Sequence, residues 1–270
     1  MIPRLFISEW SSFTPWQKME MVEQDLILSR AIIDIFNDPL LQQKVAFRGG
    51  TALHKLYLRP PARYSEDIDL VQVNAEPVGS TIDRFRLVLS YLGEPVRKQK
   101  DRNTTLIYRF GSETPPTVPL RLKIEINCRE HFTVFGYRQI PYQINSRWFS
   151  GGGNIVTYSL EELLGSKLRA LFQRKKGRDL FDIWYCLKYQ KVNVHNLISA
   201  FDGFLQHDKR TILKDEFLDN IADKISDPDF RNDTTGLIRP EIDYDLEKCW
   251  NLVRSILLPV MKPELGLHSK

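Results

Sequence analysis

The alternation of apolar and polar positions predicts a mixture of strands and helices in the first half of the chain. Helices are predicted where apolar residues recur every three or four positions, and strands where they alternate or form short buried runs. The first helix should begin at Thr14, because Pro15 follows it and Gln17 completes a capping box. Residues 131–153 mix aromatic residues with glycines, and the pattern resolves no element there. We expect helices over 14–35, 52–58 and 82–92, and strands over 45–47, 67–73, 96–100, 104–110 and 120–126.

From Leu160 onward the pattern is helical. Apolar residues at helical spacing predict a helix that begins at Leu160, and a basic turn over 174–178 follows it. The change of pattern falls near the glycines at 151–153. We therefore predict an α+β fold, with an N-terminal helix and a mixed-sheet α/β domain over 1–155 and a helical domain over 156–270. The later helices are expected over 179–189, 195–206, 212–225 and 244–258.

Composition places the chain among ordinary globular proteins. At 270 residues, with 42% hydrophobic and 27% charged residues, it can bury a sizeable core. The net charge of +4 permits an anionic partner without requiring one. The three cysteines are far apart and include no CxxC pair, which favours a reducing compartment over a disulfide framework or a zinc site. Because no apolar leader and no run of membrane-spanning length is evident, we expect a cytoplasmic protein without a membrane partner.

A glycine-rich stretch in the first half has the features of a phosphate-binding turn. Gly49, Gly50 and Thr51 stand where a short helix is predicted to begin. Glycine lets the backbone approach a ligand closely, and the N–H groups at a helix start favour anions. The spacing does not fit a P-loop, which needs G-x-x-x-x-G-K-[ST]. An EF-hand beginning at Asp67 is excluded because its sixth position is Gln72 rather than glycine.

Carboxylates follow this stretch on a predicted strand. Asp67 and Asp69 are two positions apart and therefore share one face of the strand. Glu125 lies on the polar face of another strand, so three carboxylates converge if the two strands are neighbours. Such an oxygen-rich site suits Mg²⁺ or Mn²⁺, and two ions ~3.5–4 Å apart would assist an in-line displacement at phosphorus. In this interpretation Asp67 and Asp69 hold the metals, and Glu125 completes the site and helps to deprotonate an incoming hydroxyl. The alternative is an acidic strand terminus without a metal.

Two residues of the helical half are further candidates. Lys167 lies on the apolar stripe of its helix, where its ammonium must reach solvent or find an anion. It would contact a nucleotide triphosphate in the functional interpretation and extend to solvent in the structural one. Asp179 stands near a helix start, where it is either a capping residue or part of the chemistry. We also expect Asp182 to pair with Arg178 across one helical turn.

Several polar residues near these candidates have two interpretations each. Arg63 could bind phosphate or hold Glu66, and Ser65 could cap a turn or contact a phosphate. The basic turn over 174–178 is either a solvated loop or, with Arg178, a guide for RNA or a triphosphate.

Together these motifs resemble the AbiEii-type nucleotidyltransferase toxins of the polymerase-β-like superfamily, over roughly residues 20–255. The resemblance implies a mixed-sheet nucleotidyltransferase domain followed by a helical C-terminal half. By motif match Gly50 and Thr51 would hold phosphates, Asp67 and Asp69 metals, and Lys167 and Asp179 would be further functional positions. The segments that carry the resemblance are Gly49-Gly50-Thr51, Arg63-x-Ser65-x-Asp67-x-Asp69, Lys123-x-Glu125-Ile126, Lys167-x-x-Ala170 and Arg174-x-x-x-Arg178-Asp179-x-x-Asp182.

The same resemblance implies a biological role. It indicates the toxin of a bacterial toxin–antitoxin or phage-defence system, with a separately encoded antitoxin. It also implies nucleotide transfer from a nucleoside triphosphate to an acceptor, which in characterised members is the acceptor end of tRNA. Two other functions stay open from the residues alone. One is transfer to a protein or small molecule, and the other is a nucleotide-binding module without catalysis. The sequence names neither the preferred base nor the oligomeric state.

Overall fold

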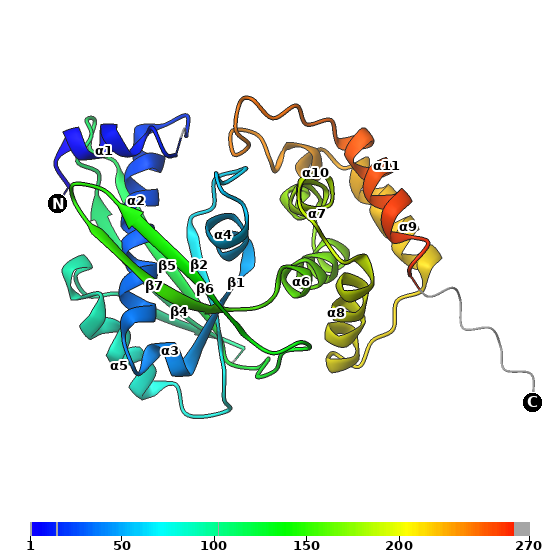
Figure 1. The fold of residues 1–270 in the computed structure, drawn as a ribbon, viewed down its shortest axis with the longest axis horizontal. Coiled ribbons are helices and arrows are strands. Elements are labelled where there is room, and N and C mark those ends of the chain that lie inside the picture. The colour runs from blue at the N-terminus through cyan, green and yellow to red at the C-terminus, as the bar shows by residue number, and fades with distance from the viewer. Residues whose placement is uncertain (1, 15, 102, 262–270) are drawn as a thin grey trace, which may run out of the picture. The chain divides into compact units, whose positions relative to one another are not determined.

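The computed structural model describes residues 2–14, 16–101 and 103–261 (Figure 1). The chain forms two compact units, Met1–Tyr158 and Ser159–Lys270. The glycines at 151–153, which suggested a boundary, lie inside a strand instead. The predicted boundary after residue 155 falls within that same strand, which ends at Thr157.

The first unit contains one seven-stranded sheet, in the order β3-β4-β5-β2-β1-β7-β6. The sheet is mixed, because β2 pairs with β5 and β1 with β7 in parallel while the other neighbours are antiparallel. The predicted α+β class is therefore confirmed. The strands are β1 Val45–Arg48, β2 Asp67–Gln72, β3 Val96–Lys100, β4 Asn103–Gly111, β5 Pro119–Asn127, β6 Arg138–Asn145 and β7 Ser150–Thr157.

The helices of this unit are mostly short. The long helix α2 packs on the sheet, and α5 covers the same face near β4, where the Tyr108 hydroxyl donates to the carbonyl of Phe85. Apolar residues of β2, β4 and β5 fill this face, as their alternation predicts. The helices are α1 Arg4–Trp10, α2 Met19–Asn37, α3 Leu41–Lys44, α4 Gly49–Ala52 and α5 Gly79–Val88, with a π-helical turn over Leu53–Tyr57 and a 3₁₀ turn over Ser90–Leu92.

The long helix α2 begins five residues after the predicted start. Its N-cap is Lys18, and no side chain caps it. The hydroxyl of Thr14 instead donates to the carbonyl of Trp10, so it belongs to the turn that follows α1. Pro15, the predicted first helical residue, lies outside the described residues. The helix ends at Asn37, two residues beyond the predicted end at residue 35.

The segment without a prediction, residues 131–153, supplies most of a β-hairpin. Strands β6 and β7 pair from Arg138↔Thr157 to Asn145↔Ser150. The glycines of β7 serve packing, because a Cβ on Gly153 would lie 2.4 Å from the side-chain oxygen of Asn37 in α2. Strands interrupted by glycine lack the alternation that sequence patterns detect.

Within the first unit, a buried ion pair joins helix α2 to the π-helical turn over Leu53–Tyr57. The ammonium of Lys55 lies 2.7 Å from both carboxylate oxygens of Asp25 and 3.0 Å from the hydroxyl of Ser29. The indole N–H groups of Trp10 and Trp16 also donate to Asp25. Burial of the Lys55 ammonium opposes its charge, but the attraction of Asp25 prevails and raises the pKa of Lys55.

The second unit is all-helical. Ser159 begins it as the N-cap of α6, accepting from the backbone N–H of Glu162 at 3.2 Å. The long helices carry apolar stripes that meet in one core, as the helical spacing predicts. Among the described residues, no helix has the length and apolar character needed to cross a bilayer. The helices are α6 Leu160–Gln173, α7 Gly177–Tyr189, α8 Val194–His207, α9 Lys214–Ile225, α10 Pro228–Asn232 and α11 Leu246–Leu257.

Removing the Lys55 ammonium should destabilise the first unit. We expect Lys55→Met to lower the free energy of unfolding by about 3–5 kcal/mol, because Asp25 would keep its buried charge without its counterion. Denaturant titration of the intact chain measures the change. Lys98→Met, at an exposed position of β3, is the matched control. Equal stability of the two variants would show that the indole N–H groups of Trp10 and Trp16 alone stabilise the buried charge of Asp25.

Candidate active site

The turn between β1 and α4 is shaped by one carboxylate. Gly49, the first residue of α4, has φ +79°, a conformation that favours glycine. A Cβ at this position would lie 2.2 Å from Oδ2 of Asp69. Strands β1 and β2 are antiparallel with Arg48 opposite Asp69, so the Asp69 carboxylate is held against the start of α4. Gly49 is therefore required twice, by its φ angle and by the close approach of Asp69.

The next glycine makes room for a buried arginine. A Cβ on Gly50 would lie 2.7 Å from Nη2 of Arg63 and 3.1 Å from Oγ of Ser65. Arg63 is 2% exposed, and its Nη1 donates to the carbonyl of Tyr64 at 2.9 Å. The hydroxyls of Thr51 and Ser65 lie 2.8 Å apart. These predicted phosphate-binding residues thus join the loop before β2 to α4, and they fix the backbone of the turn.

The predicted convergence of the acidic strands is confirmed. Strand β2 lies beside β5 in parallel, with Asp67 opposite Lys123 and Asp69 opposite Glu125. Opposed residues of neighbouring strands project from the same face. The two aspartates and Glu125 therefore share one face of the sheet, while the apolar residues between them form the core on the other face.

A lysine lies within this acidic group, which the sequence analysis had not assigned to the site. The Nζ atom of Lys123 is 3.3 Å from Oδ2 of Asp67 and 2.6 Å from Oε1 of Glu125. Partial burial acts against the charge of Lys123, but its hydrogen bond to Glu125 and the attraction of Asp67 together raise the pKa of Lys123. The signal in the sequence was the spacing Lys123-x-Glu125, because residues two apart on a strand share its face.

The donor set of this face fits a divalent cation. Oδ1 of Asp67 is buried and has no hydrogen-bond partner among the described residues, while Oδ2 contacts Lys123. An unpartnered buried carboxylate oxygen is costly and is a natural ligand for a hard cation. In the part of the chain that the structure describes, no group of three or more histidine, cysteine or acidic side chains is arranged to hold a metal. The predicted third metal ligand, Glu125, is therefore wrong, because its carboxylate pairs with Lys123 instead. Asp67 and Asp69 are the two residues that fit Mg²⁺ or Mn²⁺, which usually binds through one or two carboxylates together with water and substrate phosphates.

A second ion pair lies at the end of β1, on the same face as Asp69. Arg48, which lies opposite Asp69 in the register, has its Nη1 atom 2.5 Å from Oε2 of Glu130. Burial of the Arg48 guanidinium disfavours its charge, but the attraction of Glu130 outweighs this and the pKa of Arg48 is raised. Sequence reasoning missed this pair because Glu130 comes from the loop after β5, and no local spacing relates it to Arg48.

The functional candidates of the second unit form a separate buried cluster. The Nζ atom of Lys167 lies 2.9 Å from Asp179 and 3.0 Å from Asp182, whose side chains are fully buried. Nε and Nη2 of Arg174 also donate to Asp179, at 2.7 and 2.9 Å. Burial disfavours ionised Asp179, but Lys167 and Arg174 prevail and lower its pKa. The anion required by Lys167 is thus supplied within its own unit.

This arrangement changes two local predictions. Asp179 is not a simple N-cap, because the N-cap of α7 is Lys176 and the Asp179 carboxylate accepts from side chains instead. The expected pair of Asp182 with Arg178 is wrong. Arg178 contacts Asp233, both through its Nε at 3.4 Å and through its backbone N–H at 3.1 Å. Arg178 and Asp182 have the i, i+4 spacing of a helical ion pair, but Arg178 pairs instead with Asp233, in the segment after α10.

Comparisons with known proteins identify relatives of the chain. The sequence model of the family described as "Nucleotidyl transferase AbiEii toxin, Type IV TA system" matches residues 30–252. A search among curated proteins finds no relative. Among solved structures, JHP933 from Helicobacter pylori is 19% identical with a TM-score of 0.54, covering 90% of this chain and 92% of its own. MenT4, the nucleotidyltransferase toxin Rv2826c from Mycobacterium tuberculosis, is 11% identical with a TM-score of 0.55, covering 97% and 100%. At these identities the structures support the fold.

Because Asp69 packs tightly on Gly49, adding a single methyl group at Gly49 should affect both stability and activity. We expect Gly49→Ala to displace the Asp69 carboxylate and strain the turn, lowering both the melting temperature and nucleotide transfer. Gly79→Ala is the matched control, since a Cβ there meets no atom within 4 Å. Thermal unfolding and incorporation of labelled nucleotide measure the two effects. Wild-type values for Gly49→Ala in both assays would contradict the proposed geometry.

The ion-pair cluster predicts that Lys167 stabilises the second unit. Lys167→Met should lower the free energy of unfolding by about 3–5 kcal/mol, because Asp182 and Asp179 would lose a buried counterion. The exposed Lys175, paired with Asp227 at the surface, gives the control Lys175→Met, for which little change is expected. Denaturant titration followed by tryptophan fluorescence measures both. Calorimetric titration with a non-hydrolysable triphosphate and Mg²⁺ separately tests nucleotide binding, for which a loss of about 1.5–3 kcal/mol is expected if Lys167 also contacts a phosphate.

Proposed function

The chain belongs to the AbiEii family of nucleotidyl transferase toxins, and from this premise we propose that it transfers a nucleoside monophosphate from a nucleoside triphosphate to the end of an RNA, with tRNA as the expected acceptor. The observation that carries the proposal is the pair Asp67 and Asp69 on one strand face. One Asp67 oxygen has no partner among the described residues, and Asp69 is seated against the start of α4. This constellation offers ligands for a divalent cation directly beside a glycine turn.

The transfer itself is a displacement at phosphorus. A hydroxyl oxygen of the acceptor forms a bond to the α-phosphorus of the triphosphate, and the bond from that phosphorus to the bridging oxygen breaks, so that pyrophosphate leaves. The hydroxyl proton must be removed, and Glu125 is the proposed acceptor for it, held in place by the ammonium of Lys123. When bound, Mg²⁺ or Mn²⁺ would supply charge neutralisation for the phosphate oxygens.

The other residues serve binding and position in this proposal. We assign Gly49, Gly50 and Thr51 to phosphate binding from the family motif. In the structure Gly49 and Gly50 give room to Asp69 and Arg63, and the Thr51 and Ser65 hydroxyls lie 2.8 Å apart, which holds the turn in place. Lys167 and Arg178 remain proposed for nucleotide binding, and Lys167 and Asp179 for catalysis. In the structure Lys167 and Asp179 pair with each other inside the second unit. We also propose a cytoplasmic setting, because nucleoside triphosphates and tRNA are available there.

The family gives the chain a biological context. Toxins of toxin–antitoxin systems are encoded with an antitoxin, so an antitoxin partner is implied. We propose that the transfer activity is the toxic one, acting through modified tRNA and blocked translation, and that it serves phage defence. Transfer to a protein or small molecule is the competing outcome, and the identity of the labelled product distinguishes them.

Neutralising either aspartate should abolish transfer. For Asp67→Asn and Asp69→Asn we expect no incorporation of label from any NTP into bacterial RNA. The melting temperature of Asp69→Asn should be at or slightly above the wild-type value, because the repulsion between the carboxylates is reduced, and that of Asp67→Asn should be close to wild type, because its contact with Lys123 is lost as well. Wild-type protein with labelled NTPs, separated into RNA and protein fractions, is the reference. Label in protein alone would overturn the RNA acceptor.

The same substitution tests toxicity. Expression of the wild-type chain should slow bacterial growth, and Asp69→Asn should restore it. Equal growth of the two strains would contradict the toxic role of the transfer in that host.

A further inference from the structure

The face of the sheet that carries the acidic pair continues into a group of exposed cations. Strand β4 lies between β3 and β5, with Thr105 opposite both Lys98 and Glu125. One row across the sheet therefore runs from Lys98 through Thr105 and Glu125 to Asp69. Neighbouring strands are about 4.8 Å apart, so Lys98 begins about 14 Å from Asp69 along this row.

Three more basic residues share this face. Arg109 and Arg121 are opposite each other on β4 and β5, and Lys100 lies opposite Asn103 on β4. All of them are exposed, as is Lys98. We refer to Lys98, Lys100, Arg109 and Arg121 as the basic face. It is continuous with the acidic pair through Lys123, which contacts Asp67.

The charges of the basic face are largely uncompensated. Among the residues that the structure describes, the only acidic partner of Arg121 is Glu66, which is half-buried and 3.9 Å away. Lys98, Lys100 and Arg109 form no ion pair with any residue that the structure describes. Some exposed cations elsewhere in the chain have acidic partners, as Lys175 does with Asp227 and Arg231 with Glu247. A set of unpaired cations on one sheet face is the arrangement that attracts an extended polyanion.

The opposite face of the same strands cannot serve this purpose. Its residues on β4 and β5, among them Leu106, Tyr108 and Leu122, are buried in the core. The basic face is therefore the accessible side of this part of the sheet, and it is the side on which Asp67 and Asp69 project.

We propose that the basic face binds the phosphates of the single-stranded end of the RNA acceptor and leads its terminal hydroxyl to Asp67 and Asp69. The inference rests on the proposed transfer to RNA and assigns the surface that receives the substrate. The row from Lys98 to the acidic pair is long enough to contact a few nucleotides of single-stranded RNA. The described residues of β3, β4 and β5 on this face include no aromatic side chain. Binding here is thus mainly electrostatic and tolerant of base sequence, because no aromatic ring is present to stack on the bases.

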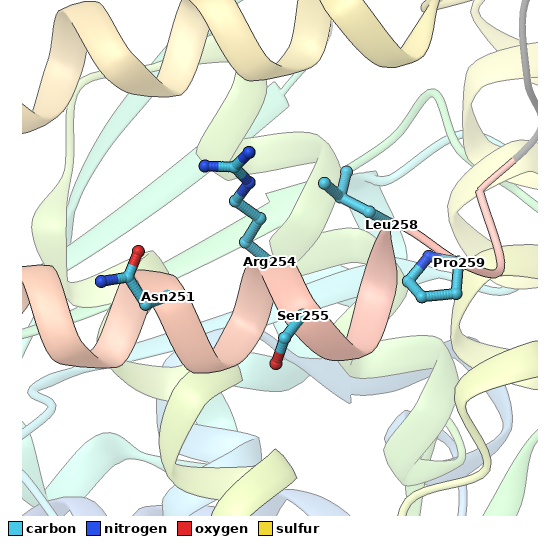
Figure 2. A pocket seen from close by; sticks show the side chains of 5 residues that line it. All are labelled: Asn251, Arg254, Ser255, Leu258 and Pro259. Atoms are coloured by element: carbon cyan, nitrogen blue, oxygen red, sulfur yellow. The ribbon is translucent and has the colours of Figure 1, made fainter.

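The test compares two triple variants of equal charge in the full-length chain. The basic-face variant is Lys98→Gln/Lys100→Gln/Arg109→Gln. The control is Arg97→Gln/Lys191→Gln/Arg254→Gln, which removes three exposed cations elsewhere. Arg97 lies on β3 but is opposite Leu106 and so projects from the other face. Arg254 lies on α11, where it lines a shallow pocket with Asn251, Ser255, Leu258 and Pro259 (Figure 2).

The readout is fluorescence anisotropy of a short fluorescein-labelled single-stranded RNA over a salt series, without nucleotide. Each phosphate contact contributes about 0.7 to the slope of log K against log salt for single strands. Loss of three contacts should make this slope shallower by about 2. If the two proteins bind equally at ~1 M salt, the variant should therefore bind about 100-fold more weakly than wild type at ~0.1 M. The control should bind as wild type does, and both variants should keep the wild-type melting temperature.

The outcomes separate this inference from the proposed function. Equal RNA binding by the two triple variants would overturn the basic face even if wild-type protein labels RNA from an NTP. Conversely, a selective loss of binding in the basic-face variant would support the surface even if wild-type protein labels no RNA, and in that case the proposed transfer fails. A basic-face variant that binds RNA normally but escapes neutralisation by a co-expressed antitoxin would assign the face to the antitoxin instead, and would also overturn the inference.

Discussion

The site depends on the contact between the Asp69 carboxylate and the backbone of Gly49. This contact forces a glycine with positive φ at the start of α4, and the antiparallel pairing of β1 with β2 holds both partners in register. The parallel pairing of β2 with β5 then brings Glu125 and Lys123 to the same face. A segment of fewer than 30 residues, 45–72, therefore contributes both the turn and the acidic pair, and the rest of the sheet supports their relative position.

In both units, buried carboxylates are stabilised by ion pairs with lysine or arginine. Asp25, paired with Lys55, and Asp179, paired with Lys167 and Arg174, are buried carboxylates that cations neutralise. Such clusters contribute less to stability than their short distances suggest, because both charges lose water, but removal of one member is costly. Asp67 is the exception, since one of its oxygens has no hydrogen-bond partner within the described chain. This contrast supports the proposal that Asp67 binds a cation.

Strict alternation and helical spacing were enough to predict most of the fold. The residues of β5 alternate without interruption, so its face assignments followed directly from the sequence. The convergence of Asp69 and Glu125 also needed β2 and β5 to be neighbours, which the structure shows. The hairpin β6–β7 was missed because the glycines of β7 interrupt the alternation, and one of them, Gly153, packs on Asn37 of α2, more than 100 residues away in the sequence. The pairs Arg48 with Glu130 and Arg178 with Asp233 were missed for the same reason, since their partners are brought together by tertiary packing alone. Thr14 was misassigned because a capping hydroxyl can serve the preceding turn as readily as the following helix.

Strand β3 has a consequence for the behaviour of the protein in concentrated solution. It is the last strand of the sheet, all five of its residues are exposed, and its outer edge is a template on which another strand could pair. Three of those residues, Arg97, Lys98 and Lys100, are cations, and like charges brought edge to edge repel. The chain thus protects its open edge against self-association by charge, so that its colloidal stability should fall as salt rises and screening shortens the reach of that repulsion.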